Sequence, residues 1–551
     1  MAKHTFDNIL YYGDNLDVLR KYIKDETIDL CYIDPPFNSD RTYHQLYLNQ
    51  GKEDKAQAQA FTDTWTWNDA AIKGYSEICS NTNNVFTKQC IEIISGFKKA
   101  LGDSPLMAYI ISMALRIAEI HRVLKDTGGF YLHCDPMASH YIKLVMDSIF
   151  CANQGEYRNE IIWKRQNAKG LAFTRFASNH DVIFYYTKTN KFVWNPQYKS
   201  HDDKYVDDFY KYTEPETGRV YSLADLTNPN KNRPNLNYEF LGITRVWRWT
   251  KTRMEKAYND GLIVQTKADS VPRLKRYLDE QEGTAIDDIW IDILPVQSQA
   301  KESLGYPTQK PESLLERIIQ ASSNEGDLIL DAYCGCGTSI AVAQRLKRKW
   351  IGIDITYQSI SVILKRLKEH FGQEIIDKTE LNGVPKDMDS AVELAHKKDD
   401  RVRKEFEKWA VLTYSDNKAI INEKKGADSG IDGIAFMLTG HDEHKQVLFS
   451  VKSGSLTLSM IRDFCHVVDR ENAAMGLFIT LEEPTKPMLK EVKALGNYMN
   501  PLTNQEYPKI EIVTIDELLK GKRLNLPQAI KVLKDAESKK KDIDESQMKL
   551  L

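Results

Sequence analysis

Four residues, Asp34-Pro35-Pro36-Phe37, follow the apolar run IDLCYI and combine groups that could accept hydrogen bonds from a ligand and stack against it. Proline has no backbone N–H, so two in a row cannot continue a strand. The strand therefore stops at Asp34 and leaves a carboxylate, proline carbonyls and an aromatic ring at its carboxyl end. Ligands bind at that end in open α/β sheets. Taken alone, the same residues are equally compatible with a turn that only ends a strand.

A second motif, DLILDAYCGCGTSI, occupies residues 327–340. It reads as a strand ending in Asp331, a turn carrying Gly335 and Gly337, and a helix, and glycines at such a turn let the backbone approach a ligand closely. The next predicted strand, KWIGID, delivers Asp354 19 residues after Gly335, near the spacing expected of an acid that binds ribose hydroxyls. The motif predicts a nucleoside site, although by itself it also fits an ordinary β-α-β turn.

The elements around these motifs alternate between strands and helices. Ser104 and Pro105 open an apolar helix that ends before Gly128, the strand GFYLHCD follows, and another helix runs to about Ile149. Such alternation predicts an α/β fold with a parallel, doubly wound sheet. The regularity fails from about 195 to 300, where polar and aromatic residues with Asn-Pro and Arg-Pro turns suggest an inserted region.

Composition limits the classes of function. The 551 residues, 42% of them hydrophobic, suffice for about two to four domains. A net charge of −3 excludes a global attraction to polyanions, so any nucleic-acid surface must be a local basic patch. Eight cysteines without zinc-like spacing predict reduced, buried thiols. The lack of a long apolar run predicts a cytoplasmic protein with no membrane partner.

One segment, GITRVWRWTKTRMEK, interleaves cations with aromatic residues, which suits phosphate contact and base stacking. From 241 to 280 the chain holds nine Lys or Arg against five acids. A second basic pair follows a predicted strand in IIWKRQN. The candidate DNA-binding residues are Lys164, Arg165, Arg245, Trp247, Arg248, Trp249 and Lys251. A solvated basic face remains the alternative for each arginine.

Together the motifs resemble the β-class S-adenosylmethionine-dependent DNA amino-methyltransferases, over most of residues 7–365. The family's [DNS]PP[YFW] motif corresponds to residues 34–37, and its F-x-G-x-G motif to residues 333–337, with Tyr333 in the usual Phe place. The catalytic motif precedes the cofactor motif, as in the β class, and YPTQKPESLLERII resembles the helix before the cofactor strand. The resemblance implies that the cofactor is bound by Asp14, Asn15, Thr308, Lys310, Asp331, Tyr333, Gly335, Gly337, Thr338 and Asp354.

The resemblance implies transfer of a methyl group to adenine N6 in double-stranded DNA, with cytosine N4 as the alternative. Asp34, Pro35, Pro36 and Phe37 would be catalytic: Asp34 and the Pro35 carbonyl accept the amino protons, so the nitrogen lone pair can attack the sulfonium methyl. Phe37 would stack on a base that has left the duplex. The transfer needs no metal. β-class relatives are often dimers, so a homodimer is a candidate partner state, in a restriction-modification or host-defence context.

A third module contains KEFEKWAVL, GADSGIDGIAF and QVLFSVKSG, and resembles the Mrr-type restriction endonuclease-like fold over about 401–520. Glu407, Asp432 and Lys452 stand in its active-site places, where acids would hold Mg²⁺. Ser450 replaces the usual Glu or Gln, so Mg²⁺ is expected only if the domain is an active nuclease. Two alternatives stay open: a combined restriction-modification enzyme, and a DNA-binding scaffold with an inactive catalytic site.

The predicted organisation is a Rossmann-like methyltransferase sheet with permuted motif order, an inserted target-recognition region and a second α/β domain. The predicted parts are a first catalytic half (1–194), the target-recognition region (195–300), a cofactor-binding half (301–372), a linker (373–400), the endonuclease-like domain (401–524) and a tail (525–551).

Overall fold

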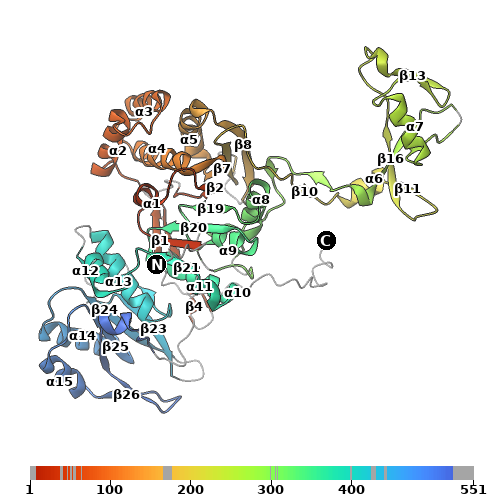
Figure 1. Ribbon diagram of the computed structural model, residues 1–551. Helices are drawn as coiled ribbons and strands as arrows, with labels where there is room; N and C mark the ends of the chain where they lie inside the picture. The colour runs from red at the N-terminus through yellow and green to blue at the C-terminus, as the bar shows by residue number, and fades with distance from the viewer. Residues whose placement is uncertain are drawn as a thin grey trace, which may run out of the picture. The chain divides into compact units, whose positions relative to one another are not determined.

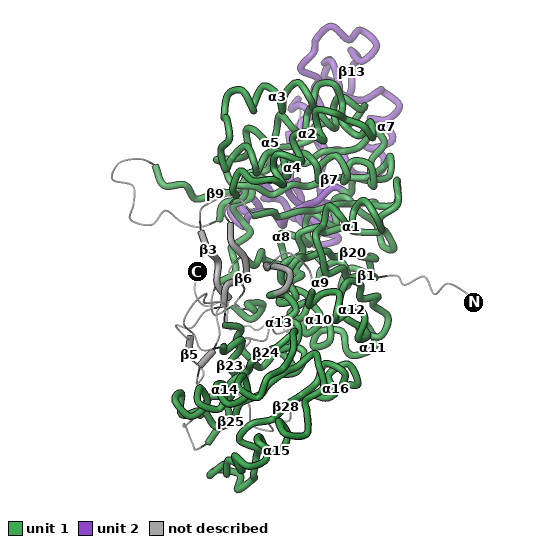
Figure 2. Tube along the Cα trace, turned by 90° about the vertical axis from the view of Figure 1, so that its left-hand side faces the viewer, with its two compact units in different colours: residues 1–195, 288–551 green, residues 196–287 purple. Residues whose placement is uncertain are grey.

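The chain forms two compact units in a computed structural model (Figure 2): residues 1–195 with 288–551, and residues 196–287. The residues that the structure describes are 8–36, 41–45, 48–49, 52–53, 58–63, 65–165, 176–267, 269–297, 300–304, 306, 308–396, 400–422, 430–439 and 444–524. Phe37 and the predicted tail therefore lie outside the described residues.

A nine-stranded sheet organises the first unit. Its strands, in spatial order, are β18 (Ile289–Trp290), β8 (Glu156–Lys164), β9 (His180–Thr187), β7 (Leu124–Cys134), β2 (Ile28–Ile33), β19 (Leu328–Asp331), β20 (Lys349–Asp354), β1 (Asn8–Tyr12) and β21 (Thr379–Asn382). Strand β9 is antiparallel to both neighbours, and the other neighbouring pairs are parallel. The predicted α/β fold with a doubly wound sheet is confirmed.

Helices cover both faces of this sheet (Figure 1). On one face lie α1 (Asn15–Tyr22), α2 (Asp69–Ser80), α3 (Lys88–Leu101), α4 (Pro105–Val123) and α5 (Pro136–Ile149); on the other lie α8 (Glu312–Ser322), α9 (Thr338–Arg345) and α10 (Tyr357–Phe371). This division follows from right-handed crossovers, because the chain moves one way across the sheet from β1 to β7 and the other way from β19 to β20.

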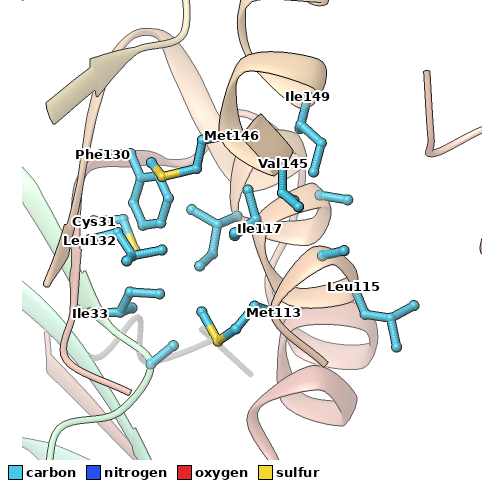
Figure 3. Close-up of a cluster of buried hydrophobic side chains, with 14 of the residues drawn as sticks. Cys31, Ile33, Met113, Leu115, Ile117, Phe130, Leu132, Val145, Met146 and Ile149 are labelled. Atoms are coloured by element: carbon cyan, nitrogen blue, oxygen red, sulfur yellow. The ribbon is translucent and has the colours of Figure 1, made fainter. Parts of the chain in front are cut away.

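The main core lies between the sheet and helices α4 and α5 (Figure 3). Cys31 and Phe130 from the strands meet Ile117 and Met146 from the helices, and all four are at most 2% exposed. Helix α4 begins where its sequence indicates: the Ser104 hydroxyl accepts from the Met107 N–H at 3.2 Å, and proline occupies the first turn. This core fixes the positions of β2 and β7.

The segment predicted to be a linker is partly built into the sheet. Helix α11 (Gln373–Asp377) leads into β21, which pairs in parallel with β1 at the sheet edge, and α12 (Met388–Ala395) follows. The linker interpretation is wrong for β21, whose short polar sequence TELN carries no apolar alternation. Its place is set by the unpaired backbone edge of β1 rather than by a side-chain pattern.

The second unit has its own small core. It contains the sheet β11 (Tyr212–Thr213), β12 (Val220–Asp225), β16 (Arg273–Tyr277) and β15 (Ile263–Val264), the hairpin β13 (Asn237–Phe240) and β14 (Ile243–Val246), the pair β10 (Tyr198–Lys199) and β17 (Thr284–Ala285), and helices α6 (Asp203–Phe209) and α7 (Lys251–Asn259). Trp247, Met254 and Phe240 fill its interior. This unit falls within the predicted inserted region.

The C-terminal domain, residues 400–524, is a second α/β layer structure within the first unit. Its sheet has the order β22 (Ile420–Ile421), β23 (Gly433–Leu438), β24 (His444–Lys452), β25 (Met475–Thr480) and β28 (Ile510–Thr514). Its helices are α13 (Asp400–Tyr414), α14 (Leu458–Arg470), α15 (Lys486–Ala494) and α16 (Ile515–Leu519). The remaining strands of the unit form the pairs β3 (Arg41–Gln45) with β6 (Ala58–Asp63), β4 (Leu48–Asn49) with β5 (Lys52–Glu53), and β26 (Asn497–Met499) with β27 (Glu506–Pro508).

Candidate functional site

Acidic side chains gather at the carboxyl ends of three adjacent strands. Asp34 follows β2, Asp331 ends β19 and Asp354 ends β20, and the register sets Asp331 beside Tyr32 and Gly352. The connections diverge between β2 and β19, since the chain passes from β2 to β7 on one side and from β19 to β20 on the other. Open α/β sheets bind ligands at such a divergence. The two sequence motifs therefore meet at one place.

Asp34 is paired with a lysine from a distant part of the chain. The Lys310 ammonium forms an ion pair with the Asp34 carboxylate, and both side chains are mostly buried, at 12% and 16% exposed. The family resemblance implies a cofactor-binding role for Lys310, whereas the structure brings this lysine to the predicted catalytic acid. The Asp34 carboxylate is therefore held in place at the strand end by Lys310, with Pro35 as the next residue.

A buried polar row supports this strand end. The Tyr32 hydroxyl is 3.0 Å from His133 Nδ1, and His133 Nε2 is 3.1 Å from Asp181 Oδ2. Arg165 lies 3.3 Å from the other oxygen of Asp181. Burial acts to raise the pKa of Asp181, but the bond to His133 and the charges of Lys310 and Arg165 outweigh it and lower the pKa. Sequence reasoning missed this row because its members come from separate strands.

The glycine loop after β19 takes a conformation that suits glycine. Gly335 and Gly337 have φ of 50° and 73°, and a Cβ on Gly337 would lie 2.7 Å from Ile363 Cγ1. Asp331, 3% exposed, accepts from the Ser339 hydroxyl and from the Tyr333 N–H at 3.0 Å. Burial raises the pKa of Asp331 to about 7. In the structure, Asp331 holds the glycine loop through these two hydrogen bonds.

Asp354 is tied to the same loop. One carboxylate oxygen accepts from the Gly335 N–H at 2.9 Å, and the other accepts from the Thr356 N–H at 2.9 Å and its hydroxyl at 3.0 Å. Burial raises the pKa of Asp354 to about 6 despite these bonds. The next side chain, Ile355, is apolar and 60% exposed. An acid and an exposed apolar side chain therefore stand together at the end of β20.

The loop before α1 closes on the glycine loop. Asn15 donates to the Ala332 carbonyl at 2.7 Å, and Arg116 from α4 donates to Asn15 at 2.5 Å and lies 3.0 Å from Asp14. Asp14 also caps α1 by accepting from the Leu16 N–H at 2.8 Å. Arg116 was not singled out from the sequence, although a lone arginine in the apolar stretch ISMALRIAEI is a visible signal.

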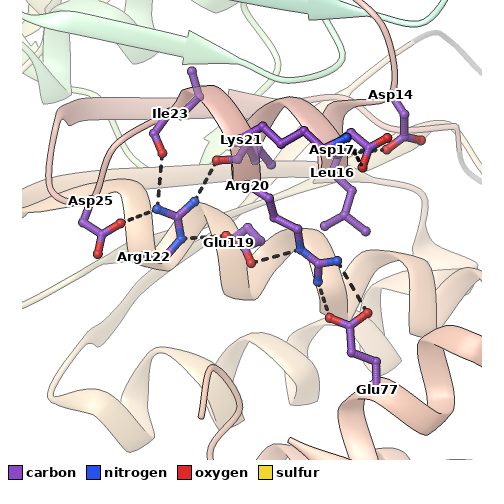
Figure 4. A network of polar contacts seen from close by, with 11 residues as sticks. Asp14, Leu16, Asp17, Arg20, Lys21, Ile23, Asp25, Glu77, Glu119 and Arg122 are labelled. Atoms are coloured by element: carbon purple, nitrogen blue, oxygen red, sulfur yellow. Dashed lines mark hydrogen bonds and ion pairs between the residues drawn. The ribbon is translucent and has the colours of Figure 1, made fainter. Parts of the chain in front are cut away.

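Ion pairs hold α1 against its neighbouring helices (Figure 4). Arg20 bridges Glu77 on α2 and Glu119 on α4, and Arg122 binds Glu119 at 2.6 Å while also contacting Asp25. Glu119 is 4% exposed, so this carboxylate depends on both arginines. The network fixes α1 and hence the loop that carries Asp14 and Asn15.

The segment before α8 packs against the glycine loop. Tyr306, 8% exposed, has its ring within 4 Å of the place where a Gly335 Cβ would stand, and its hydroxyl is 3.2 Å from Ser359 Oγ. Thr308 is half-buried two residues later. Thr338, the first residue of α9, is 5% exposed. Hydrogen bonds between the two chain halves also bring the loop of Asp14 and Asn15 to the glycine loop and to Asp354 at one edge of strand ends.

The predicted DNA-binding residues divide into exposed and buried ones. Arg245, Arg248 and Lys251 are exposed, and Arg253 lies 4.1 Å over the ring of Trp249, which is half-buried. Trp247 is fully buried, and its indole N–H donates to the Tyr238 carbonyl at 2.9 Å. The expectation that Trp247 stacks on a base is therefore corrected: the indole packs in the core of its unit.

The other basic pair lies at the end of β8 in the first unit. Lys164 is half-buried, and Arg165 is committed to Asp181 with its side chain 39% exposed. The guanidinium of Arg165 is therefore paired with the buried carboxylate of Asp181, and only the exposed part of the arginine side chain faces solvent.

The three endonuclease-like residues lie in separate parts of the C-terminal domain. Asp432 precedes β23 and accepts from the Val451 N–H at 2.7 Å, and burial raises its pKa although Lys452 and Lys404 act to lower it. Glu407 lies on α13 and Lys452 ends β24. Ser450 is 1% exposed. In the described part of the chain, no group of three or more His, Cys, Asp or Glu could hold a metal ion.

No described helix is long and apolar enough to cross a membrane.

Residues 402–520 match the family NACHT-associated inactive Restriction Endonuclease 1. This match, to a family described as inactive, agrees only loosely with the Mrr-type interpretation. The endonuclease-like character of the domain is confirmed, and the Mrr-type assignment is not.

Several curated methyltransferases and a restriction-modification subunit are similar to the chain. Type II methyltransferase M.EcaI of Enterobacter cloacae is 28% identical over 47% of this chain and 57% of its own length. The Mod subunit of the type III restriction-modification enzyme StyLTI of Salmonella typhimurium is 24% identical over 62% of this chain and 50% of its own length. DNA adenine methyltransferase YhdJ of Escherichia coli is 25% identical over 67% of this chain and 86% of its own length. The chain thus spans about half the length of the first two relatives.

Among solved structures, a DNA modification methylase of Thermus thermophilus complexed with S-adenosyl-L-methionine aligns with 68% of this chain and 98% of its own, at 13% identity and a TM-score of 0.31. Residues 28–365, more than half of the chain, match the DNA methylase family N6_N4_Mtase and include both strand-end motifs. The chain belongs to this family of DNA methylases.

Proposed function

We propose that this protein transfers a methyl group from S-adenosylmethionine to the N6 amino group of adenine in double-stranded DNA. The observation that carries the proposal is the meeting of Asp34-Pro35 with the glycine loop and Asp354 at adjacent strand ends of one sheet. A restriction-modification context is supported by a relative named as a type II methyltransferase and by one named as the Mod subunit of a type III restriction-modification enzyme.

The strand-end residues fit a nucleoside cofactor. Asp354 would accept from ribose hydroxyls, Ile355 offers an apolar surface to the adenine, and Gly335 and Gly337 keep the adjoining backbone free of side chains. Asn15, held by Arg116, closes the loop from the other side. S-adenosylmethionine, when bound, supplies an electrophilic methyl group on a sulfonium.

The protein's own part in the transfer is to prepare the amino nitrogen. Asp34 and the Pro35 carbonyl would accept hydrogen bonds from its two N–H groups and draw the nitrogen toward a tetrahedral geometry, in which its lone pair is no longer delocalised into the ring. The rigid prolines hold both acceptors at little entropic cost. Lys310, which now pairs with Asp34, would stay beside the carboxylate and balance its charge while the base is bound. Phe37 would stack on the extruded base.

Adenine is favoured over cytosine by two facts. The motif begins with Asp rather than Ser, and YhdJ is by name an adenine methyltransferase. The proposal is tested by incubating the protein with tritiated S-adenosylmethionine and either duplex DNA or RNA of the same sequence. We expect label in duplex DNA. Label confined to RNA, or none despite cofactor binding, would refute a DNA substrate.

The second unit would supply the target-recognition surface. Lys231, Arg233, Arg245, Arg248, Lys251, Arg253 and Lys256 form its basic segment. All seven are exposed, and none has an ion-pair partner among the described residues. Arg219 and Lys275 elsewhere in the unit are paired with acids. Unpaired cations attract phosphates and release counterions on binding.

Replacing Arg245, Arg248 and Lys251 together by alanine is expected to weaken DNA binding and make it less sensitive to salt. Each lost phosphate contact reduces the slope of log K against log salt by about 0.9, so the slope should fall by about 2 to 3. Fluorescence anisotropy across a salt series measures it. Lys204→Ala, an exposed cation on α6, is the control. An unchanged slope in the triple variant would remove this segment from the DNA interface.

The C-terminal domain is proposed not to cut DNA. Ser450 is buried at the place where the related nucleases carry Glu or Gln, and the matching family is described as inactive. Incubation of unmethylated plasmid with Mg²⁺ and the full chain is expected to leave the plasmid intact on a gel. Linear or nicked products that disappear in a Lys452→Ala variant would show instead a working nuclease and a combined restriction-modification enzyme.

A further inference from the structure

A carboxylate of the C-terminal domain contacts two residues that neighbour the proposed cofactor site. Glu405 on α13 accepts from the backbone N–H of Tyr357 at 3.0 Å and from the hydroxyl of Tyr12 at 3.3 Å. Its side chain is 13% exposed and forms an ion pair with Lys408 at 3.0 Å. Glu405 belongs to the endonuclease-like region, while both of its hydrogen-bond donors belong to the methyltransferase sheet and its helices.

Both donors neighbour Asp354, one on the adjacent strand and the other three residues further along the chain. Tyr12 is the last residue of β1, lies opposite Asp354 in the parallel register, and precedes Gly13, whose N–H donates to the Asp354 carbonyl at 2.9 Å. Tyr357 follows Thr356, which donates two hydrogen bonds to the Asp354 carboxylate. Each partner of Glu405 is therefore adjacent in the chain to a residue that binds Asp354.

Further contacts around Glu405 indicate that its interaction with the start of α10 is specific. Tyr357 is the first residue of α10, and a carboxylate at a helix start satisfies a free N–H and favours the helix dipole. The Tyr357 hydroxyl makes a second bridge to Thr413 Oγ1 on α13, at 3.0 Å. The Tyr12 and Tyr357 rings meet edge to face with centroids 6.1 Å apart. Two side chains of α13, Glu405 and Thr413, therefore form hydrogen bonds with Tyr357 at the start of α10.

We propose that Glu405 is a positioning residue for the cofactor site: through Tyr12 and Tyr357 it holds Asp354 in place, so the C-terminal domain controls cofactor affinity. This inference rests on the proposed binding of S-adenosylmethionine by Asp354. Coupling between two sites is reciprocal, so cofactor binding must also stabilise the contacts of α13 with Tyr12 and Tyr357. A domain with no nuclease reaction of its own then has a role in the methyl transfer.

The test measures cofactor binding by the full chain. Glu405→Ala removes an acceptor of two hydrogen bonds, one of them at a helix start, and is expected to raise the dissociation constant of S-adenosylmethionine about tenfold in calorimetry. We expect kcat at saturating cofactor and KM for DNA to stay at wild-type values. Glu405→Gln keeps an acceptor oxygen and should restore most of the affinity.

The matched control is Glu491→Ala, which removes the same charge from the same domain. Glu491 pairs with Arg462 at 2.6 Å on the surface, so this variant should bind the cofactor as the wild type does. Tyr12→Phe removes only the hydroxyl and should weaken binding in the same direction, which keeps the test valid if Glu405→Ala fails to fold. Hydrogen exchange of residues 400–414 should slow when cofactor is added.

Wild-type affinity in both Glu405→Ala and Tyr12→Phe, or unchanged exchange in α13, would overturn the inference and leave the proposed function standing. Failure of the wild-type chain to bind S-adenosylmethionine at all would refute the proposed function itself. The two failures are therefore distinguishable.

Discussion

Asp34→Ala is expected to lower kcat for methyl transfer about a thousandfold, with little change in the affinity for S-adenosylmethionine. The reason is that Asp34 would act on the amino nitrogen in the transition state, and removing one such acceptor or donor from an enzyme site typically costs about 10²- to 10³-fold. Single-turnover label transfer measures the rate, and calorimetry measures cofactor binding. Loss of the side chain also frees Lys310 from its ion pair.

Two controls separate chemistry from charge. Asp34→Asn keeps one acceptor oxygen and should retain more activity than the alanine variant. Asp17→Ala removes a carboxylate from the exposed face of α1, where it pairs with Lys21 at 3.5 Å, and should be neutral. Transfer by Asp34→Ala at the wild-type rate would show that the Asp-Pro-Pro strand end does not take part in the chemistry.

Asp354→Ala is expected to weaken binding of S-adenosylmethionine about a hundredfold. Ribose hydroxyls that donate to an ionised carboxylate form strong bonds, and the alanine variant also leaves the Gly335 and Thr356 N–H groups without their acceptor. Turnover at saturating cofactor should recover much of its wild-type value. A loss of kcat with unchanged cofactor affinity would contradict the assigned role.

The raised pKa of Asp354 predicts that cofactor affinity depends on pH. Burial raises the pKa of Asp354 to about 6, so the carboxylate becomes protonated as pH falls through 6. Protonation removes acceptor capacity, and cofactor affinity should therefore fall on the acid side. Asp331 also titrates at a raised pKa, of about 7. Asp354→Asn separates the two: it should abolish the step near pH 6, and persistence of that step would assign it elsewhere.

Local sequence signals were sufficient for the elements that hold the site. The proline pair ended β2 after Ile33, the Ser104-Pro105 cap began α4, and the glycines near Gly335 formed a tight loop before α9. Each signal acts within a few residues of the chain, through a missing N–H, a capping side chain or a backbone conformation that suits glycine. Such effects can be read from sequence.

Contacts between distant parts of the chain could not be predicted in this way. Lys310 reaches Asp34 across 276 positions, and Asp181 reaches His133 from another strand. The basic residues next to Trp247 in the sequence suggest a surface position, yet its indole packs in the small core of its unit. Strand β21 was missed because its position depends on the edge of β1 rather than on its own side chains. These features follow from strand order and packing.

The most direct test of the central claim is nucleoside mass spectrometry of duplex DNA after incubation with the protein and isotopically labelled S-adenosylmethionine. Wild-type protein should produce labelled N6-methyladenine, and the Asp34→Ala variant should produce almost none. Labelled N4-methylcytosine would replace the proposed base, and the absence of any labelled nucleoside from DNA would contradict methyl transfer at this strand-end site.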